Sequence, residues 1–142
     1  MDEPIPIRIL AWPEARASAM SVREAVFVVE QGVPAEIEVD EWDPASEHAL
    51  AFGPGGRAIG TGRLLPDGHI GRMAVLSDWR GRGVGSAILA ALVNRAAARG
   101  MRRLVLNAQT HAVPFYARHG FAAFGDEFME ADIPHVAMAR EL

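Results

Sequence analysis

A glycine-rich turn at residues 80–86 is the part of this sequence best suited to hold a ligand. Its sequence, Arg-Gly-Arg-Gly-Val-Gly-Ser, joins a predicted strand to a predicted helix. Glycines let successive backbone N–H groups converge without interference from Cβ atoms, at the positive end of the helix dipole. We therefore expect the turn to bind an anion, most naturally a phosphate or a diphosphate.

Three classes of phosphate-bearing ligand compete for this turn. A P-loop is excluded because it needs a lysine, and all 14 basic residues of the chain are arginine. A dinucleotide fingerprint is disfavoured because its third glycine position falls on Ser86, and because no acid follows at the usual spacing of about 20 residues. The third class is coenzyme A.

Two motifs resemble those of the GNAT family of N-acetyltransferases. Residues 80–85 are similar to the family's Arg-x-x-Gly-x-Gly motif, and they follow a predicted strand as that motif does. Residues 112–121 resemble the family's second motif, with Phe115, Tyr116 and Gly120 in matching positions. Residues 27–31 and 133–135 are similar to a small, ElaA-like bacterial branch of the family.

The resemblance implies one acetyltransferase domain over residues 1–142, using acetyl-CoA as cosubstrate. By this resemblance, the N–H groups of the turn bind the diphosphate, the preceding strand pairs with the pantetheine arm, and Tyr116 gives a proton to the departing sulfur. Gln109 stands where many members carry an asparagine. The implied coenzyme-binding residues are Met73, Ala74, Val75, Arg80, Gly81, Arg82, Gly83, Val84, Gly85, Ser86, Gln109 and Tyr116.

The general base is specified less well than the acid. No carboxylate occupies the strand at residues 73–75, where some members of the family keep a base. Carboxylates elsewhere in the chain could act directly or through water, and histidine titrates near neutral pH. Five residues remain open as the base: Asp40, Glu41, Asp43, His111 and His135. We expect catalysis from Glu41 and His111, and contacts to the acceptor from Asp40, Asp43 and His135.

Arg63 and Arg72 provide a second indication about the acceptor. If Asp67 and Gly68 form a two-residue hairpin turn, the two arginines lie directly opposite each other on antiparallel strands. Like charges in that position repel unless something compensates them. We expect either that an acid of residues 40–43 covers them or that they bind an anion such as a substrate carboxylate. A register shifted by one residue would instead separate them.

The hydrophobic pattern around these motifs predicts an α/β (α+β) domain, and the resemblance implies that it has the GNAT fold. The element order gives a mixed central sheet of about six to seven strands, antiparallel in its first half. A strand-helix-strand unit with parallel strands follows, which by the resemblance carries the coenzyme A site, and helices cover both faces. The predicted strands are 5–10, 48–52, 57–65, 69–76, 104–106, 121–124 and 136–139, and the predicted helices are 13–31, 84–100 and 113–118.

Composition and charge exclude several other classes of protein. The length of 142 residues suits one domain, and the absence of cysteine excludes thiolate zinc sites and cysteine nucleophiles. We expect no bound metal. The net charge of −4 disfavours nucleic-acid binding. The acidic start and the lack of a long apolar run predict neither a signal peptide nor a membrane span, and hence a cytoplasmic protein.

The charges are segregated along the chain. Eight acids and no arginine lie between Glu24 and Gly56, whereas seven arginines and no acid lie between Trp79 and Gly125. A basic segment suits a polyanionic cofactor and an acidic segment suits a cationic acceptor, although two solvated faces would give the same pattern.

Three functions remain open at this point. The first is an N-acetyltransferase acting on a small-molecule or peptidyl amine, and the second is a catalytically silent acyl-CoA-binding sensor or regulatory module. The third, a dinucleotide-binding fragment, is disfavoured by Ser86. Because members of the GNAT family often dimerise, the resemblance also suggests a homodimer.

Overall fold

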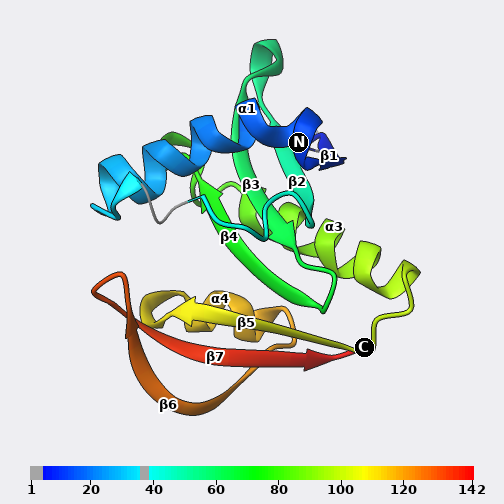
Figure 1. The fold of residues 1–142 in the computed structure, drawn as a ribbon, viewed down its shortest axis with the longest axis vertical. Coiled ribbons are helices and arrows are strands. Elements are labelled where there is room, and N and C mark those ends of the chain that lie inside the picture. The colour runs from blue at the N-terminus through cyan, green and yellow to red at the C-terminus, as the bar shows by residue number, and fades with distance from the viewer. Residues whose placement is uncertain (1–4, 36–38) are drawn as a thin grey trace.

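The computed structural model describes residues 5–35 and 39–142; the acidic start at 1–4 and Glu36 and Glu38 of the acidic segment lie outside the described residues. Within them the strands form one seven-stranded sheet, in the order β1-β2-β3-β4-β5-β7-β6 (Figure 1). Neighbouring strands are antiparallel except β4 and β5, which are parallel. The strands are β1 (Ile7–Ala11), β2 (Glu47–Phe52), β3 (Ala58–Leu64), β4 (His69–Val75), β5 (Arg103–Gln109), β6 (Ala122–Glu130) and β7 (Ile133–Glu141). The helices are α1 (Trp12–Arg23), η1 (Glu24–Glu30), η2 (Pro54–Gly56), η3 (Ser77–Trp79), α3 (Val84–Ala98), η4 (Thr110–Ala112) and α4 (Val113–Arg118).

The two long helices cover opposite faces of the first half of the sheet. Leu50 of β2 packs in one core cluster with Ala15 and Ala19 of α1. Its neighbours Ala49 and Ala51 belong to the main core cluster, which α3 dominates. Because successive side chains of a strand point to opposite faces, α1 and α3 must lie on opposite sides. The predicted mixed sheet with helices on both faces is therefore confirmed.

Two glycines of β3 allow α3 to approach the sheet closely. A Cβ atom at Gly62 would lie 2.6 Å from Met73 Sδ, 2.9 Å from Ile88 Cγ2 and 3.0 Å from Leu92 Cδ1. A Cβ atom at Gly60 would lie 2.7 Å from Ile88 Cδ1. Since the contacts come from helix and strand at once, a side chain at either position forces the two layers apart.

We expect Gly62→Ala to destabilise the fold by about 1–3 kcal/mol, the usual effect of overfilling a packed core. The matched control is Gly71→Ala on the paired strand, where an added Cβ meets nothing within 4 Å. Urea unfolding of both variants measures the difference. Equal stability of the two variants would contradict the close packing of α3 on β3.

The β3–β4 hairpin has a longer turn than the sequence predicts. The Leu65 N–H donates to His69 O at 2.8 Å, and the Gly68 N–H donates to Leu65 O at 3.1 Å. A two-residue turn would instead pair Pro66 with His69, but proline has no N–H to donate. Gly68 takes up the left-handed conformation that closes the three-residue loop, with φ of +95°.

A bulge in β4 further changes the predicted register. Arg63 pairs with Gly71 and Thr61 pairs with Ala74, so Gly62 faces two residues of β4. Arg72 adopts a left-handed conformation in this bulge, with φ of +50°. The prediction that Arg63 lies directly opposite Arg72 is therefore wrong, because the turn shifts the register by one residue and the bulge restores it only beyond Arg72.

Two other elements differ from their predicted form. The predicted helix 13–31 becomes a seven-residue π-helix, η1, after Arg23. This change coincides with the β-branched valines of η1, which are stiff at χ1 and disfavour a regular α-helix. The final hairpin is longer than predicted, and every residue of β6 is exposed, so no alternating apolar pattern marks this strand. None of the described helices combines the length and apolar character needed to cross a bilayer.

Candidate active site

The candidate active site lies where β4 and β5 separate. These parallel strands pair only at His69 with Val105 and at Ile70 with Leu106. Beyond this point β4 bulges, while β5 continues to pair with β7. A cavity of about 990 Å³ lies at this divergence, lined by residues of η1, β4, the glycine turn, β5, α4 and the β6–β7 hairpin.

The glycine turn lines this cavity at the start of α3. Gly81 and Gly83 have φ values of +74° and +83°, conformations that favour glycine. A Cβ atom at either position would meet nothing within 4 Å, so open space lies beside the backbone. The first N–H groups of the 15-residue helix α3 have no intrahelical acceptor. A diphosphate would fit a turn with these properties.

The Arg80 side chain is bound by an ion pair. Its two terminal nitrogens donate to the two carboxylate oxygens of Glu30 on η1, at 2.5 and 2.8 Å, and its Nε donates to Val75 O at 3.0 Å. The hydrogen bond from Arg80 lowers the pKa of Glu30. The guanidinium therefore ties η1 to the end of β4.

Two more side chains of the turn have protein partners. Arg82 lies over the ring of Trp79, 5.0 Å from its centroid, and does not line the cavity. Ser86 Oγ lies 3.0 Å from His119 Nε2. Burial, together with the positive charges of Arg118 and Arg140, lowers the pKa of His119. The lowered pKa favours the neutral form of the imidazole that contacts the Ser86 hydroxyl.

Tyr116 reaches the cavity from α4. It is 9% exposed, and its ring packs edge-to-face against Phe115 and Phe121, with centroid distances of 5.1 and 6.1 Å. Burial raises the pKa of Tyr116 to about 12. The hydroxyl thus keeps its proton throughout the neutral range and can act as a proton donor.

Gln109, at the end of β5, contacts the opposite side of the cavity. Its Nε2 donates to Gln31 Oε1 at 3.0 Å, and both side chains line the cavity. Gln31 directly follows Glu30, the partner of Arg80. Glu30 and Gln31 therefore connect η1 to both diverging strands. Glu30 reaches the end of β4 through Arg80, and Gln31 contacts β5 through Gln109.

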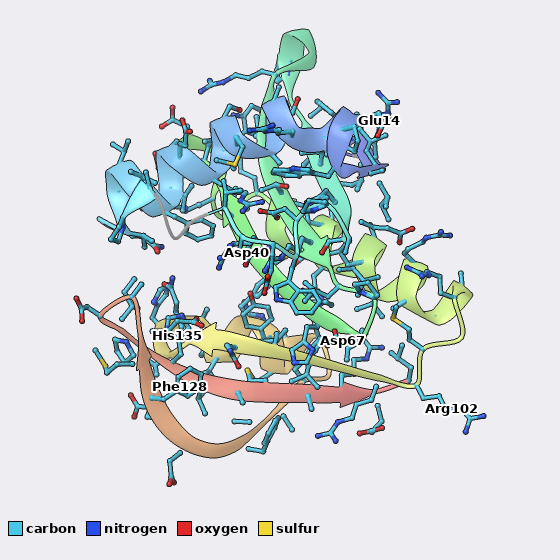
Figure 2. The ribbon with its side chains drawn as sticks, viewed as in Figure 1. Glu14, Asp40, Asp67, Arg102, Phe128 and His135 are labelled. Atoms are coloured by element: carbon cyan, nitrogen blue, oxygen red, sulfur yellow. The ribbon has the colours of Figure 1, made fainter. Side chains whose placement is uncertain are left out.

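Arg63 and Arg72 converge on Asp40 despite the shifted register. Arg63 donates to both carboxylate oxygens of Asp40, at 2.7 and 3.0 Å, and Arg72 donates to Oδ2 at 3.2 Å. Figure 2 shows Asp40 beside β4. Of the two arrangements expected for these arginines, the structure contains the one in which an acid of residues 40–43 covers them.

Asp43 belongs to the interior of this ion-pair network. Its side chain is 0% exposed and receives two hydrogen bonds from Arg23, at 2.9 and 3.0 Å, and one from Arg63 at 3.0 Å. Burial alone would raise the pKa of Asp43, but the hydrogen bonds and charges of these arginines lower it to about 2. A carboxylate held in this way is a structural anion and is unsuited to act as a base at neutral pH.

The remaining candidate bases differ in position. Burial opposes ionisation of Asp40, but Arg63 and Arg72 lower its pKa. Glu41 is exposed and does not line the cavity. His111 and His135 both line it, His111 exposed and His135 buried.

The cavity thus brings together most of the residues singled out from the sequence. Arg82, Asp40, Glu41 and Asp43 are not among the residues that line it. Within residues 5–35 and 39–142 no group of three or more histidines and acids could hold a metal ion. The predicted residues that line the cavity are Arg63, Arg72, Met73, Ala74, Val75, Arg80, Gly81, Gly83, Val84, Gly85, Ser86, Gln109, His111, Tyr116 and His135.

Sequence reasoning missed Glu30, Gln31 and Glu130 as lining residues. Glu30 and Gln31 lie in the segment 27–31, which resembles the ElaA-like branch. That similarity indicates the family but does not indicate which residues line the site. Glu130 lies in a strand whose second half was not predicted, so no pattern pointed to it.

Comparison with known proteins agrees with this geometry. The family model described as an acetyltransferase (GNAT) domain matches residues 15–142. The chain belongs to the GNAT family. GNAT proteins use an acyl-CoA cosubstrate, which the cavity and its glycine turn suit.

Individual GNAT relatives cover nearly the whole chain. The Bacillus subtilis (strain 168) protein called uncharacterized N-acetyltransferase YjcF is 44% identical over 132 residues, covering 90% of this chain and 94% of that protein. The crystal structure of Escherichia coli ElaA matches with a TM-score of 0.87 and 29% identity, covering 96% and 100% of the two chains. An acyl-CoA N-acyltransferase from Pseudomonas aeruginosa matches with a TM-score of 0.85 and 29% identity, covering 96% and 99%. The expected similarity to ElaA is confirmed.

Proposed function

We propose that this GNAT domain is an acetyl-CoA-dependent N-acetyltransferase that acts on the primary amine of a small molecule or a peptide, with both substrates bound together. The observation that carries the proposal is one cavity that joins an anion-binding turn to a buried, protonated tyrosine. Acetyl-CoA supplies an acetyl group activated as a thioester. A sensor module would need the turn but would have no use for the tyrosine hydroxyl.

Each part of the chain has a distinct task in this proposal. The backbone of Gly81, Gly83 and the first turn of α3 holds the diphosphate, as helix N-termini do. The β4 backbone at Met73, Ala74 and Val75, which does not pair with β5, offers N–H and C=O groups to an extended arm, as in β-strand addition. Tyr116 holds the proton that a departing thiolate requires.

Free thiol release from acetyl-CoA with a panel of amines tests the activity. Polyamines, aminosugars, amino acids and peptides are suitable acceptors. Release that depends on the amine supports the enzyme, whereas binding of acetyl-CoA without release for any amine would favour the silent module.

We expect Gly81→Ala to weaken acetyl-CoA binding at least tenfold, because the added methyl group occupies the space beside the turn. Gly55→Ala is a matched control: φ is +72° at Gly55 and +74° at Gly81, and an added Cβ meets nothing within 4 Å at either position. Both variants therefore carry the same left-handed strain of about 1–2 kcal/mol. Calorimetric titration with acetyl-CoA measures the affinities; equal weakening in both variants would contradict the role of the turn.

A further inference from the structure

The β6–β7 hairpin reaches the cavity with an acid and a histidine in contact. Glu130 and His135 both line the cavity, and Glu130 Oε2 lies 3.4 Å from His135 Nε2. The turn between the strands holds Ala131 and Asp132 in left-handed conformations, with φ of +50° and +61°. Such conformations are unfavourable for residues with side chains and persist only where the surroundings impose them.

The hydrogen bonds of His135 determine which of its nitrogens can accept a proton. Its Nδ1 lies 2.7 Å from Ile133 O, and a carbonyl oxygen can only accept a hydrogen bond. Nδ1 therefore carries a proton, and the lone pair of the neutral ring is on Nε2, the nitrogen nearest Glu130. The ring is 6% exposed and stacks on Phe128 with a centroid distance of 5.9 Å, so its orientation is set (Figure 2).

We propose that His135 Nε2 is the general base and that Glu130 attracts the acceptor as a cation, which makes the acceptor an aliphatic primary amine that arrives as an ammonium ion. This inference rests on the proposed function. His111 lies on η4, which packs against β7, and Arg118 lies on α4, which packs against β6. The charged or titratable residues that line the cavity together with Glu130 and His135 are Glu30, Arg63, His69, Arg72, Arg80, His111, Tyr116 and Arg118. Opposite His135 on β5 lies Gln109, which is uncharged.

The proton transfer balances as follows. One N–H bond of the ammonium breaks, the proton forms an N–H bond with His135 Nε2, and the electron pair stays on the amine nitrogen as the lone pair that attacks. Glu130 stabilises the imidazolium until it releases this proton to water. The amine nitrogen then forms a bond to the acetyl carbon and the carbon–sulfur bond breaks, its electron pair leaving on sulfur. Tyr116 gives its proton to the sulfur and regains a second proton from the amine, so amide, thiol and one proton are formed.

The first test is the protonation pattern of the histidine ring. Long-range ¹H–¹⁵N spectra of the full chain distinguish the two neutral tautomers, and His135→Asn assigns the signals. We expect His135 as the Nδ1–H tautomer, with signals that respond to an alkylamine such as putrescine without acetyl-CoA. An Nε2–H tautomer, or signals indifferent to the amine, would overturn the proposal.

The second test is the pH profile of kcat/KM for the amine. We expect His135→Asn, which keeps a donor for Ile133 O, to lower kcat/KM at least tenfold and to abolish the fall in rate at acidic pH. Glu130→Gln should raise KM for a cationic amine, because the carboxylate that attracts it is lost. Glu127→Gln, at an exposed position of the same strand that does not line the cavity, is the control.

The outcomes separate this inference from the proposed function. If no amine gives thiol release with the unmodified chain, the proposed function fails and the inference fails with it. If transfer occurs and His135→Asn folds but keeps the acidic limb, or if His111→Asn abolishes that limb instead, only the inference is overturned. Thermal unfolding of each variant shows whether it folds.

Discussion

Replacing Tyr116 with phenylalanine is expected to lower kcat at least about a hundredfold, the lower end of the usual contribution of a positioned proton donor. The phenylalanine ring keeps the edge-to-face contacts with Phe115 and Phe121. The affinity for acetyl-CoA and the stability should therefore change little. Steady-state kinetics, calorimetric binding and thermal unfolding of the same preparation measure the three quantities.

The protonation state of Tyr116 adds a second readout to this prediction. An ordinary tyrosine titrates near pH 10, but burial raises the pKa of Tyr116 to about 12. The unmodified enzyme should therefore retain its proton donor up to pH 10, with no loss of kcat from this group. Unaltered turnover in Tyr116→Phe would remove the tyrosine from the mechanism, whereas a matching loss of acetyl-CoA affinity would indicate a binding role.

Replacing Asp43 with alanine is expected to have the largest effect on stability, about 3–5 kcal/mol. The substitution leaves the buried guanidinium of Arg23, whose side chain is 1% exposed, without its bidentate carboxylate. Asp78→Ala, at an exposed position, is the control and should change stability by less than about 0.5 kcal/mol. Urea unfolding at pH 7 compares the two variants, and similar losses would contradict a structural role for the buried pair.

The same carboxylate gives the fold a predictable dependence on pH. The pKa of Asp43 is 3.8 in the unfolded chain and about 2 in the folded protein. Between these two pH values the carboxyl group is ionised when the protein is folded and protonated when it is unfolded, so unfolding takes up a proton. The resulting stabilisation, about 2 kcal/mol, is fully present above pH 4 and is lost as the pH falls through 2. Unfolding free energies from pH 5 to pH 2 should fall for the unmodified chain and fall less for Asp43→Ala.

The sequence was most informative where function depends on local backbone. The glycine turn could be predicted because its residues are consecutive and because a strand before it and an apolar helical stripe after it are visible in the pattern. Tyr116 was found by the spacing of a family motif. The overall strand order followed from the alternation of short periodic segments, which is also a local property.

Long-range contacts around the cavity could not be predicted in the same way. Glu30 and Arg80 are 50 positions apart, and nothing in either neighbourhood indicates the other. The shifted register depends on Pro66 lacking an N–H and on a bulge at Arg72, whereas the sequence prediction considered only Asp67 and Gly68. These features depend on how distant segments meet, which a single sequence does not display.

Apart from histidines, the basic side chains that line the cavity are guanidinium groups. They belong to Arg63, Arg72, Arg80 and Arg118, and the chain contains no lysine. A guanidinium stays protonated in proteins and offers no free amine lone pair. A lysine in one of these positions would be a rival acceptor held beside the acyl donor. The arginines of this cavity therefore cannot be consumed by self-acylation as a lysine could be. Label incorporated from acetyl-CoA into a cavity side chain would have to lie on a hydroxyl or an imidazole, such as those of Ser86 and His111.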